Sequence, residues 1–304
     1  MYINKHTKFI KTPLLDILID SVNACKGAGV GIEAYPLREY VLQSTFLRIS
    51  GAQEQKLKCI CWELATNNYS YRYKYLGNVK SVYGEFSTYN QKNKVYKDLI
   101  QEITNLKYDF DITKLLWLKE IDNTTLETEF NNKINIEVDK IIKIQQNNGK
   151  IITNEIRIKI ENNLYNKFRT NKFEFIKDRI KDIFIENIKY HIINCLESSI
   201  LSKGDYKHYI LLKKDKNLFN SNNFGATNDL LLNKLKFIYE EDVIKHRHRC
   251  AHNITSYQNN LPSLKNLANA DFIYFNYFYR FTILILIDEI FMKLYEEYID
   301  TIKH

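Results

Sequence analysis

Glycine and proline are scarce in this chain, which has only 9 glycines and 3 prolines among its 304 residues. Both residue types punctuate chains at turns, so their scarcity predicts long elements with few sharp turns between them. Long elements rich in Leu, Ile, Lys and Glu favour helix over strand. We therefore predict a mainly helical protein, with strands left open in the middle third of the chain.

Helical periodicity supports this prediction in five places. Residues 14–24 form a short amphipathic helix candidate, and Pro36 is well placed to open a long helix because proline suits a first helical position. Further helices are expected over 153–200, after residue 230 and from about 267 to 302. The periodic apolar positions of the second, third and fourth helices are Leu42, Phe46, Ile49, Leu57, Ile60 and Leu64, then Phe173, Ile176, Ile180, Phe184, Ile188, Ile192 and Cys195, then Leu231, Leu232, Leu235 and Ile238.

Three segments lack this periodicity and are expected to be loops. Residues 26–31 read KGAGVG, but they lack the GK[ST] ending of a phosphate-binding loop, so a connector is the better interpretation. Residues 67–95 are rich in Tyr, Asn, Gly and Ser, and residues 214–228 are polar. Between 97 and 150 the helical pattern is weaker.

Charge and cysteine content point to an intracellular protein. The 44 basic and 36 acidic side chains leave a net charge of +8, which suits a polyanionic partner such as nucleic acid. Five cysteines with no CxxC pair favour reduced thiols over a disulfide framework. No signal peptide is visible, and the apolar run 281–287 is far shorter than the roughly 20 residues of a membrane span. We expect a cytoplasmic protein that does not bind to or cross a membrane.

Residues 245–253 read KHRHRCAHN and are the most informative stretch. Three of the 7 histidines fall here, interleaved with two arginines. Cleavage of RNA by its own 2′-hydroxyl needs a proton taken from the nucleophile, a proton given to the leaving oxygen and positive charge on the phosphorane. Histidine suits the proton transfers near neutral pH, and arginine binds phosphate oxygens without losing its charge. The pattern therefore favours RNA cleavage.

The same stretch resembles the Arg-x4-6-His signature of HEPN ribonucleases, including the RiboL-PSP and abortive-infection-like subgroups. In that family a polar residue often follows the arginine, and His248 takes that place after Arg247. Residues 46–65 also resemble the second-helix pattern of several subgroups, with an acidic residue at Glu54. The resemblance covers residues 36–66 and 228–300.

The resemblance implies a single HEPN-like domain over 1–304, built as a helical bundle, with residues of about 67–205 as a helical insertion or elaboration. It implies a metal-independent endoribonuclease without cofactors, with Arg247, His252 and His248 as catalytic residues and Glu54 and Asn253 as supporting ones. Many bacterial members are toxins or antiviral abortive-infection effectors, so an antitoxin or regulatory partner is also implied.

Helix geometry independently favours a shared site. Five positions at about 100° each place Arg247 and His252 about 140° apart on a regular helix, so they converge only across a homodimer cleft or through a nearby helix end. The final helix has more apolar surface than one bundle face requires, from Phe272, Tyr274, Phe275, Phe278 and the run 281–287. This surface serves either a dimer contact or the core of a single chain.

Two other interpretations remain open. His246, His248, Cys250 and His252 are possible zinc ligands, but alternate residues spread around a helix and no second ligand cluster is evident, so we expect no metal. The alternative function is a catalytically silent helical module that binds RNA or protein. Candidate RNA contacts are Lys245, Arg249, Lys177, Arg179 and Lys181.

For Cys250 the choice is between a thiol of lowered pKa beside Arg249 and a small buried side chain.

Overall fold

A computed structural model describes residues 5–26, 35–77, 86–112, 123–197, 224–225, 228–252 and 277–303. These residues are mainly helical, and the only β-structure among them is an isolated antiparallel bridge between Phe224 and Leu231. The prediction of a mainly helical protein is therefore confirmed.

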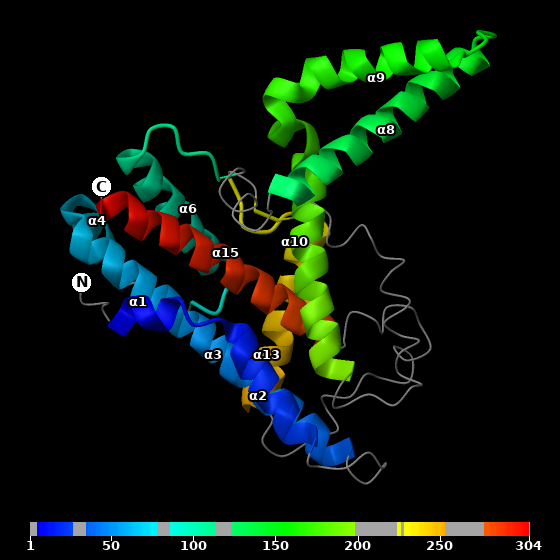
Figure 1. Cartoon of the computed structure of the whole chain (residues 1–304). Helices are drawn as coiled ribbons and strands as arrows, with labels where there is room; N and C mark the ends of the chain where they lie inside the picture. Colours follow the sequence, from blue (N-terminus) through cyan, green and yellow to red (C-terminus); the bar gives the residue numbers. More distant parts are fainter. Residues whose placement is uncertain are drawn as a thin grey trace.

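The helices follow one another along the chain as shown in Figure 1. The first half contains α1 (Lys5–Ile10), α2 (Leu14–Lys26), α3 (Tyr35–Asn67), α4 (Tyr69–Gly77), α6 (Tyr89–Leu106) and α8 (Asn123–Asn147). The second half contains α9 (Asn154–Phe168), the 3-10 turn η2 (Arg169–Asn171), α10 (Lys172–Glu197), α12 (Asn233–Ile238), the π-helical segment η3 (Tyr239–Ile244), α13 (Lys245–His252) and α15 (Tyr277–Lys303).

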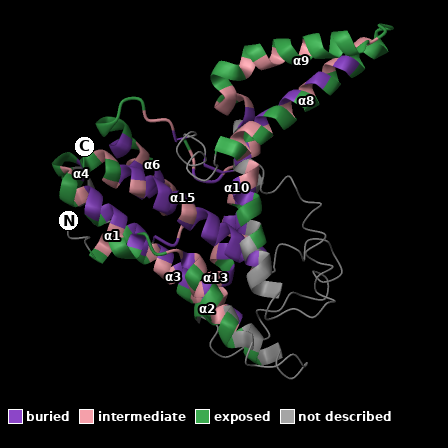
Figure 2. Ribbon diagram, viewed as in Figure 1, coloured by how far each residue is buried: buried purple, intermediate pink, exposed green. Residues whose placement is uncertain are grey.

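Helix α15 is the centre of the bundle. It packs against α3, α6 and α10, and every residue of the run 281–287 is at most 2% exposed. Figure 2 shows α15 as an almost continuous buried ribbon. Of the two roles expected for this run, the core of the single chain is therefore the correct one. Among the other apolar residues considered for a dimer contact, residues 272–275 and the side chain of Phe278 lie outside the described part of the structure.

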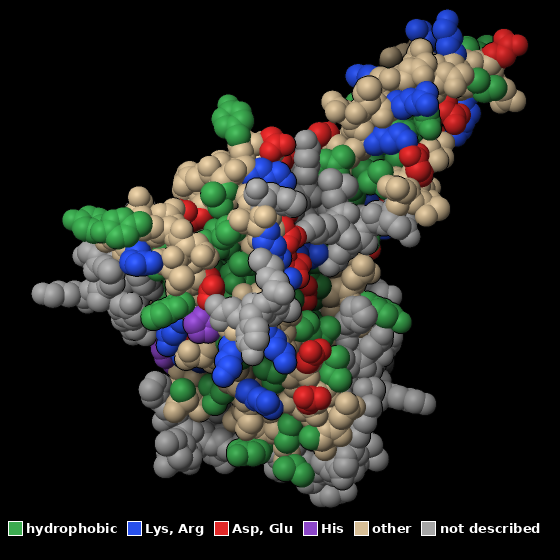
Figure 3. All heavy atoms as spheres, turned by 60° about the vertical axis from the view of Figure 1, so that its left-hand side comes forward, with side chains coloured by type: hydrophobic (Ala, Val, Ile, Leu, Met, Phe, Trp, Pro, Cys, Tyr) green, Lys and Arg blue, Asp and Glu red, His purple; other side chains and the backbone are tan. Residues whose placement is uncertain are grey.

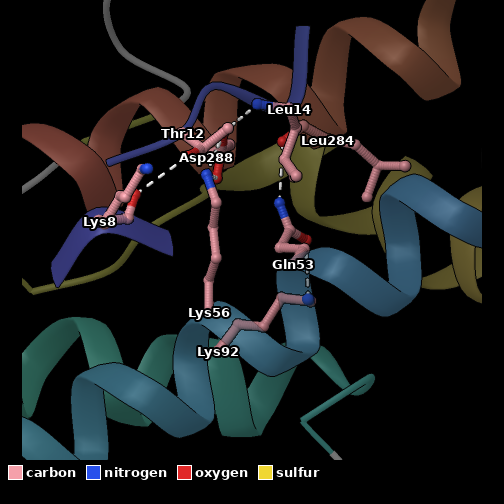
Figure 4. A network of polar contacts seen from close by, with 8 residues as sticks. All are labelled: Lys8, Thr12, Leu14, Gln53, Lys56, Lys92, Leu284 and Asp288. Atoms are coloured by element: carbon pink, nitrogen blue, oxygen red, sulfur yellow. Dashed lines mark hydrogen bonds and ion pairs between the residues drawn. The ribbon is translucent and has the colours of Figure 1, made fainter. Parts of the chain in front are cut away.

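Polar groups in this core are matched across helices (Figure 4). Asp288 of α15 accepts two hydrogen bonds from Lys56 Nζ of α3, at 2.7 and 2.9 Å, and one from the backbone N–H of Leu14 at 2.9 Å. Gln53 Nε2 of α3 donates to the Leu284 carbonyl at 2.8 Å. A buried charge needs such partners, so these bonds fix how α2 and α3 sit against α15.

Helices α8 and α9 form a hairpin that projects away from the bundle (Figure 1). One face of α8 is buried, through Phe130, Ile134, Val138 and Ile142, whereas α9 has no fully buried residue. At the turn Gly149 has φ +77°, a conformation that favours glycine. The side chain of Thr153 then accepts a hydrogen bond from the Ile156 N–H and caps α9.

Most of the periodic segments are helices as expected, but Leu231 forms the bridge to Phe224 and Leu232 precedes α12, so only Leu235 and Ile238 of that predicted face are helical. Residues 14–24 lie in α2, Pro36 is the second residue of α3, and α10 buries its predicted face at Ile176, Ile180, Phe184, Ile188 and Ile192. The side chain of Cys195, residues 27–31, residues 267–276 and most of 214–228 lie outside the described residues. Over these positions the predictions stay untested.

The prediction of a loop over 67–95 is wrong, because α4 and the start of α6 lie there. The tyrosines of this segment contribute to the core instead of marking irregular structure, since Tyr71 and Tyr89 are buried. Thr88 caps α6 by accepting a hydrogen bond from the Gln91 N–H. Tertiary burial therefore overrides weak local propensity here.

Helices α6 and α10 pack on α15, and the assignment of about 67–205 as an insertion stays a prediction.

No helix among the described residues has both the length and the apolar character to cross a membrane.

Replacing Lys56 with Met should destabilise the protein by about 3–5 kcal/mol, because it leaves the buried Asp288 carboxylate without its cation. The double variant Lys56→Met/Asp288→Leu should recover much of that loss, since it removes both buried charges. Urea denaturation of the two variants measures both effects. The exposed pair Lys140–Glu137 provides the control: Lys140→Met should cost less than about 1 kcal/mol. A comparable, small cost for Lys56→Met would contradict the role assigned to this ion pair.

Candidate functional site

Helix α13 carries the motif and continues from η3 without a break. The π-helical segment is anchored by the buried residues Tyr239, Asp242 and Val243, and the Tyr239 hydroxyl donates to the Ser87 carbonyl at 3.1 Å. A π-helical turn changes the register of the residues that follow it, and such turns are frequent at functional sites. Segment η3 therefore sets which faces of α13 meet the bundle.

Arg247 of α13 pairs with Glu54 of α3. The Nη2 and Oε1 atoms lie 2.7 Å apart, with 28% and 15% of the two side chains exposed. The contact is an ion pair without hydrogen-bond geometry, because Glu54 Oε1 has no hydrogen-bond partner. The structure thus brings together two of the residues that the sequence singled out, from helices almost 200 positions apart. The contact holds a permanent positive charge at the edge of the bundle.

Two buried groups surround this ion pair. Lys92 of α6 is 2% exposed, and burial lowers the pKa of its amine to about 7, with Arg247 adding to the lowering and Glu54 opposing it. Tyr239 is buried as well, and burial followed by the charge of Glu54 raises its pKa far above the usual range. Arg247 therefore sits where helices α3 and α6 and segment η3 meet, in surroundings of low dielectric that strengthen its field.

The histidines next to Arg247 differ in position. His248 is exposed, one residue after Arg247, and His252 is the last residue of α13. The side chain of His252 and the whole of Asn253 lie outside the described residues. Because α13 is a regular α-helix, the separation of about 140° between positions 247 and 252 holds. The two positions therefore lie on different sides of one copy of α13, and position 252 is at the helix end.

His246 belongs to the core. It is 1% exposed, and its ring packs edge-on against Phe46 and Tyr277, with ring centroids 4.9 and 5.4 Å away. Its Nε2 lies 3.3 Å from the Sγ of Cys250, a half-buried reduced thiol. Burial, followed by the charges of Arg280 and Arg249, lowers the pKa of His246 to about 2, so this histidine is neutral.

His246 and His248 therefore face different surroundings, the first buried and the second exposed. Within the described ranges, no three His, Cys, Asp or Glu side chains gather in a way that would hold a metal ion.

A second charged residue, Arg280, lies close to α13 and was not predicted from the sequence. Arg280 of α15 is 3% exposed and lies over the ring of Tyr277, with 5.5 Å between its Cζ and the ring centroid. Burial lowers the pKa of Arg280 to about 10. Burial also raises the pKa of Asp242 to about 6, against the opposing charges of Arg280 and Arg249. The signal available in the sequence was an isolated arginine within an aromatic and apolar run.

The predicted RNA contacts on α10 are balanced by acids where they are described. Arg179 contacts Glu129 at 3.1 Å and Glu186 at 3.3 Å, and the side chains of Lys177 and Lys181 lie outside the described residues. On α13, Lys245 pairs with Glu241 one turn earlier. Figure 3 shows basic and acidic side chains intermixed on the visible face of the projecting hairpin. These surfaces provide less net positive charge than the sequence alone indicates.

Comparisons with models of protein families, with curated proteins and with solved structures find no match to this chain.

Replacing His246 with Phe should change how stability depends on pH. The pKa of folded His246 is about 2, below its ordinary value of 6.5. Below pH 6.5 the unfolded chain therefore takes up a proton that the folded protein does not, which destabilises the fold by about 1.4 kcal/mol per pH unit. The variant lacks this penalty.

The measurement is the difference in unfolding free energy between His246→Phe and the wild type, from urea denaturation at pH 7.5 and pH 5. The difference should move in favour of the variant by about 2 kcal/mol at pH 5. Taking the difference cancels the opposite contribution of Asp242, whose folded-state pKa is raised. A difference that stays constant with pH would show that His246 is not held neutral.

Proposed function

We propose that this protein is a metal-independent endoribonuclease of the HEPN type. The observation that carries the proposal is the ion pair between Arg247 and Glu54. The arginine belongs to the Arg-x4-His motif, and the acid belongs to the segment that resembles the second HEPN helix. The motif and the helix pattern are separate features of the sequence, and the ion pair joins them.

The surroundings of Arg247 suit a group that stabilises a phosphorane. Glu54 restrains the guanidinium, yet 28% of the Arg247 side chain stays exposed, on a protein with a net charge of +8. A fixed positive charge needs little reorganisation when negative charge develops on the phosphate oxygens, and such preorganisation is usually the largest catalytic effect. Arginine keeps its charge at every physiological pH.

We assign the proton transfers to His252. In the reaction, the 2′-oxygen forms a bond to the adjacent phosphorus while the bond from phosphorus to the 5′-oxygen breaks. One proton leaves the 2′-hydroxyl and one is delivered to the 5′-oxygen, which yields a 2′,3′-cyclic phosphate and a 5′-hydroxyl. Neutral and protonated imidazole perform these two transfers near pH 7. His248, exposed beside Arg247, is suited to contact the RNA.

We further propose that two chains combine their α13 helices in one cleft. The separation of about 140° between positions 247 and 252 supports this arrangement, because a second copy of α13 can bring its residue 252 to the Arg247 of the first. A role as a toxin or abortive-infection effector, restrained by a partner protein, follows from the family resemblance and is part of the same proposal.

Purified protein should cut single-stranded or looped RNA in the presence of EDTA, because the proposed groups are an arginine and a histidine and need no divalent ion. Gel analysis with end-group mapping should detect 2′,3′-cyclic phosphate and 5′-hydroxyl ends. Cutting that disappears in EDTA and returns with a divalent ion would contradict the mechanism.

Arg247→Ala and His252→Ala should each reduce the cleavage rate at least about a hundredfold, as expected for loss of a charge-stabilising group or of a proton-transfer group. His248→Ala should have a smaller effect. Single-turnover cleavage assays measure these rates. Arg157→Ala is the matched control, since Arg157 is an exposed arginine of α9 that pairs with Asp139 at 3.0 Å and was not among the candidate RNA contacts. Its rate should equal that of the wild type.

Thermal melting separates catalysis from folding in these variants. If Arg247→Ala or His252→Ala is unfolded, the residue is structural and the assignment loses its support.

Light scattering should report twice the chain mass of 36.3 kDa, and a mixture of the two variants should regain part of the activity. A monomer that cuts RNA at the full rate would refute the shared cleft but not the ribonuclease.

A further inference from the structure

Five charged side chains form a cluster where α3, α6, α13 and α15 meet, and their charges do not balance. Three cations, Lys56, Lys92 and Arg247, face two carboxylates, Glu54 and Asp288. Lys56 is matched by Asp288 at 2.7 Å, and Arg247 by Glu54 at 2.7 Å. When Lys92 is protonated, the cluster therefore carries one positive charge in excess.

Lys92 has a neutral partner in place of a carboxylate. Its Nζ donates to Gln53 Oε1 at 2.7 Å (Figure 4). The orientation of Gln53 is fixed because its Nε2 donates to the Leu284 carbonyl, which leaves only the amide oxygen to face Lys92. An amide oxygen offsets only part of the cost of burying an ammonium ion. The proton on Lys92 is therefore weakly held.

The charged groups around Lys92 come from each element packed against it. Glu54 and Lys56 lie on α3, Asp288 on α15 and Arg247 on α13. Glu54 favours the protonated amine and Arg247 disfavours it, so these two residues act on Lys92 in opposite directions. Asp288 also favours the protonated amine, but it is already neutralised by Lys56.

We infer that Lys92 is a positioning residue that takes up a proton when Arg247 engages a phosphate group of the RNA. The inference rests on the proposed function and adds a buried partner to the same site. A phosphate brings negative charge to Arg247 and competes with Glu54 for the guanidinium. Protonated Lys92 then balances Glu54, which keeps the carboxylate in place while Arg247 contacts the substrate.

The coupling predicts the direction of the pH dependence. Without RNA the pKa of Lys92 is about 7, and the coupling predicts that a bound phosphate raises it. Below pH 7 the amine is protonated in both states, so the affinity for RNA does not depend on it. Above pH 7 the affinity should fall by up to tenfold per pH unit, until the raised pKa of the complex is reached.

The first test needs no RNA. Lysine labelled with ¹³C at Cε reports the titration of Lys92 by NMR in the full chain, and the Lys92→Met variant identifies its signal. Removing the positive charge in Arg247→Gln should raise the pKa of Lys92, and removing the negative charge in Glu54→Gln should lower it. A titration that is the same in both variants as in the wild type would overturn the inference.

The second test measures the proton directly. Calorimetry at pH 8 with a 2′-O-methyl oligonucleotide, which cannot be cut, in two buffers of different ionisation enthalpy gives the number of protons taken up on binding. We expect uptake approaching one proton in the wild type and none in Lys92→Met. Lys97→Met is the matched control on α6, because Lys97 is exposed and pairs with Asp229 at 3.3 Å; its uptake should equal that of the wild type.

The outcomes separate the two proposals. Binding without proton uptake, or uptake that persists in Lys92→Met, overturns the coupling, and RNA cleavage by the wild type would still support the ribonuclease. Proton uptake that depends on Lys92, in a protein that does not cut RNA, supports the coupling and refutes the ribonuclease. Because Lys92 donates to a neutral amide, Lys92→Met leaves no partner carboxylate buried without its cation, unlike Lys56→Met, and thermal melting of Lys92→Met checks that the variant folds.

Discussion

Asp288 lies in the middle of the most buried helix of the protein and receives hydrogen bonds from two other helices. A carboxylate at this depth persists only with a cation and further donors around it. Lys56 supplies the cation, and the first N–H of α2 supplies another donor. These bonds fix the rotation and the axial position of α3 against α15.

The position of α3 determines the candidate site. Gln53 and Glu54 precede Lys56 by three and two positions, so the ion pair that fixes Lys56 also fixes where these two side chains point. Gln53 orients Lys92, and Glu54 holds Arg247. The groups proposed to bind phosphate are thus set by the same contacts that hold the bundle together.

Burial assigns different roles to neighbouring residues of α13. His246 is enclosed by Phe46 and Tyr277 and is neutral, whereas His248, two positions on, faces solvent. Arg247 lies on the side of α3 and α6, and Arg249 on the side of Arg280 and Asp242. A short helix so rich in charge folds against the bundle because each of its described faces meets a different set of partners.

Much of this arrangement was predictable from the sequence, and the reasons for the failures are physical. Apolar periodicity located α3 and α10, because burying one helical face leaves a regular pattern. Lys92 could not be recognised as buried, because a lysine in a helix is usually exposed and its acceptor comes from another helix. The same limitation applies to Arg179, whose neutralising acids lie partly on α8, and to the tyrosines of α4 and α6, whose burial depends on tertiary contacts.

The central claim is that Glu54 and Arg247 act as one unit in RNA cleavage, and a double-mutant cycle tests it most directly. Single-turnover cleavage rates of the wild type, Glu54→Gln, Arg247→Lys and the double variant give the coupling between the two side chains. If Glu54 acts by holding Arg247, each single change should slow cleavage, and the double variant should be no slower than the slower single variant. Effects that multiply in the double variant, or a wild-type protein that does not cut RNA, would contradict the account.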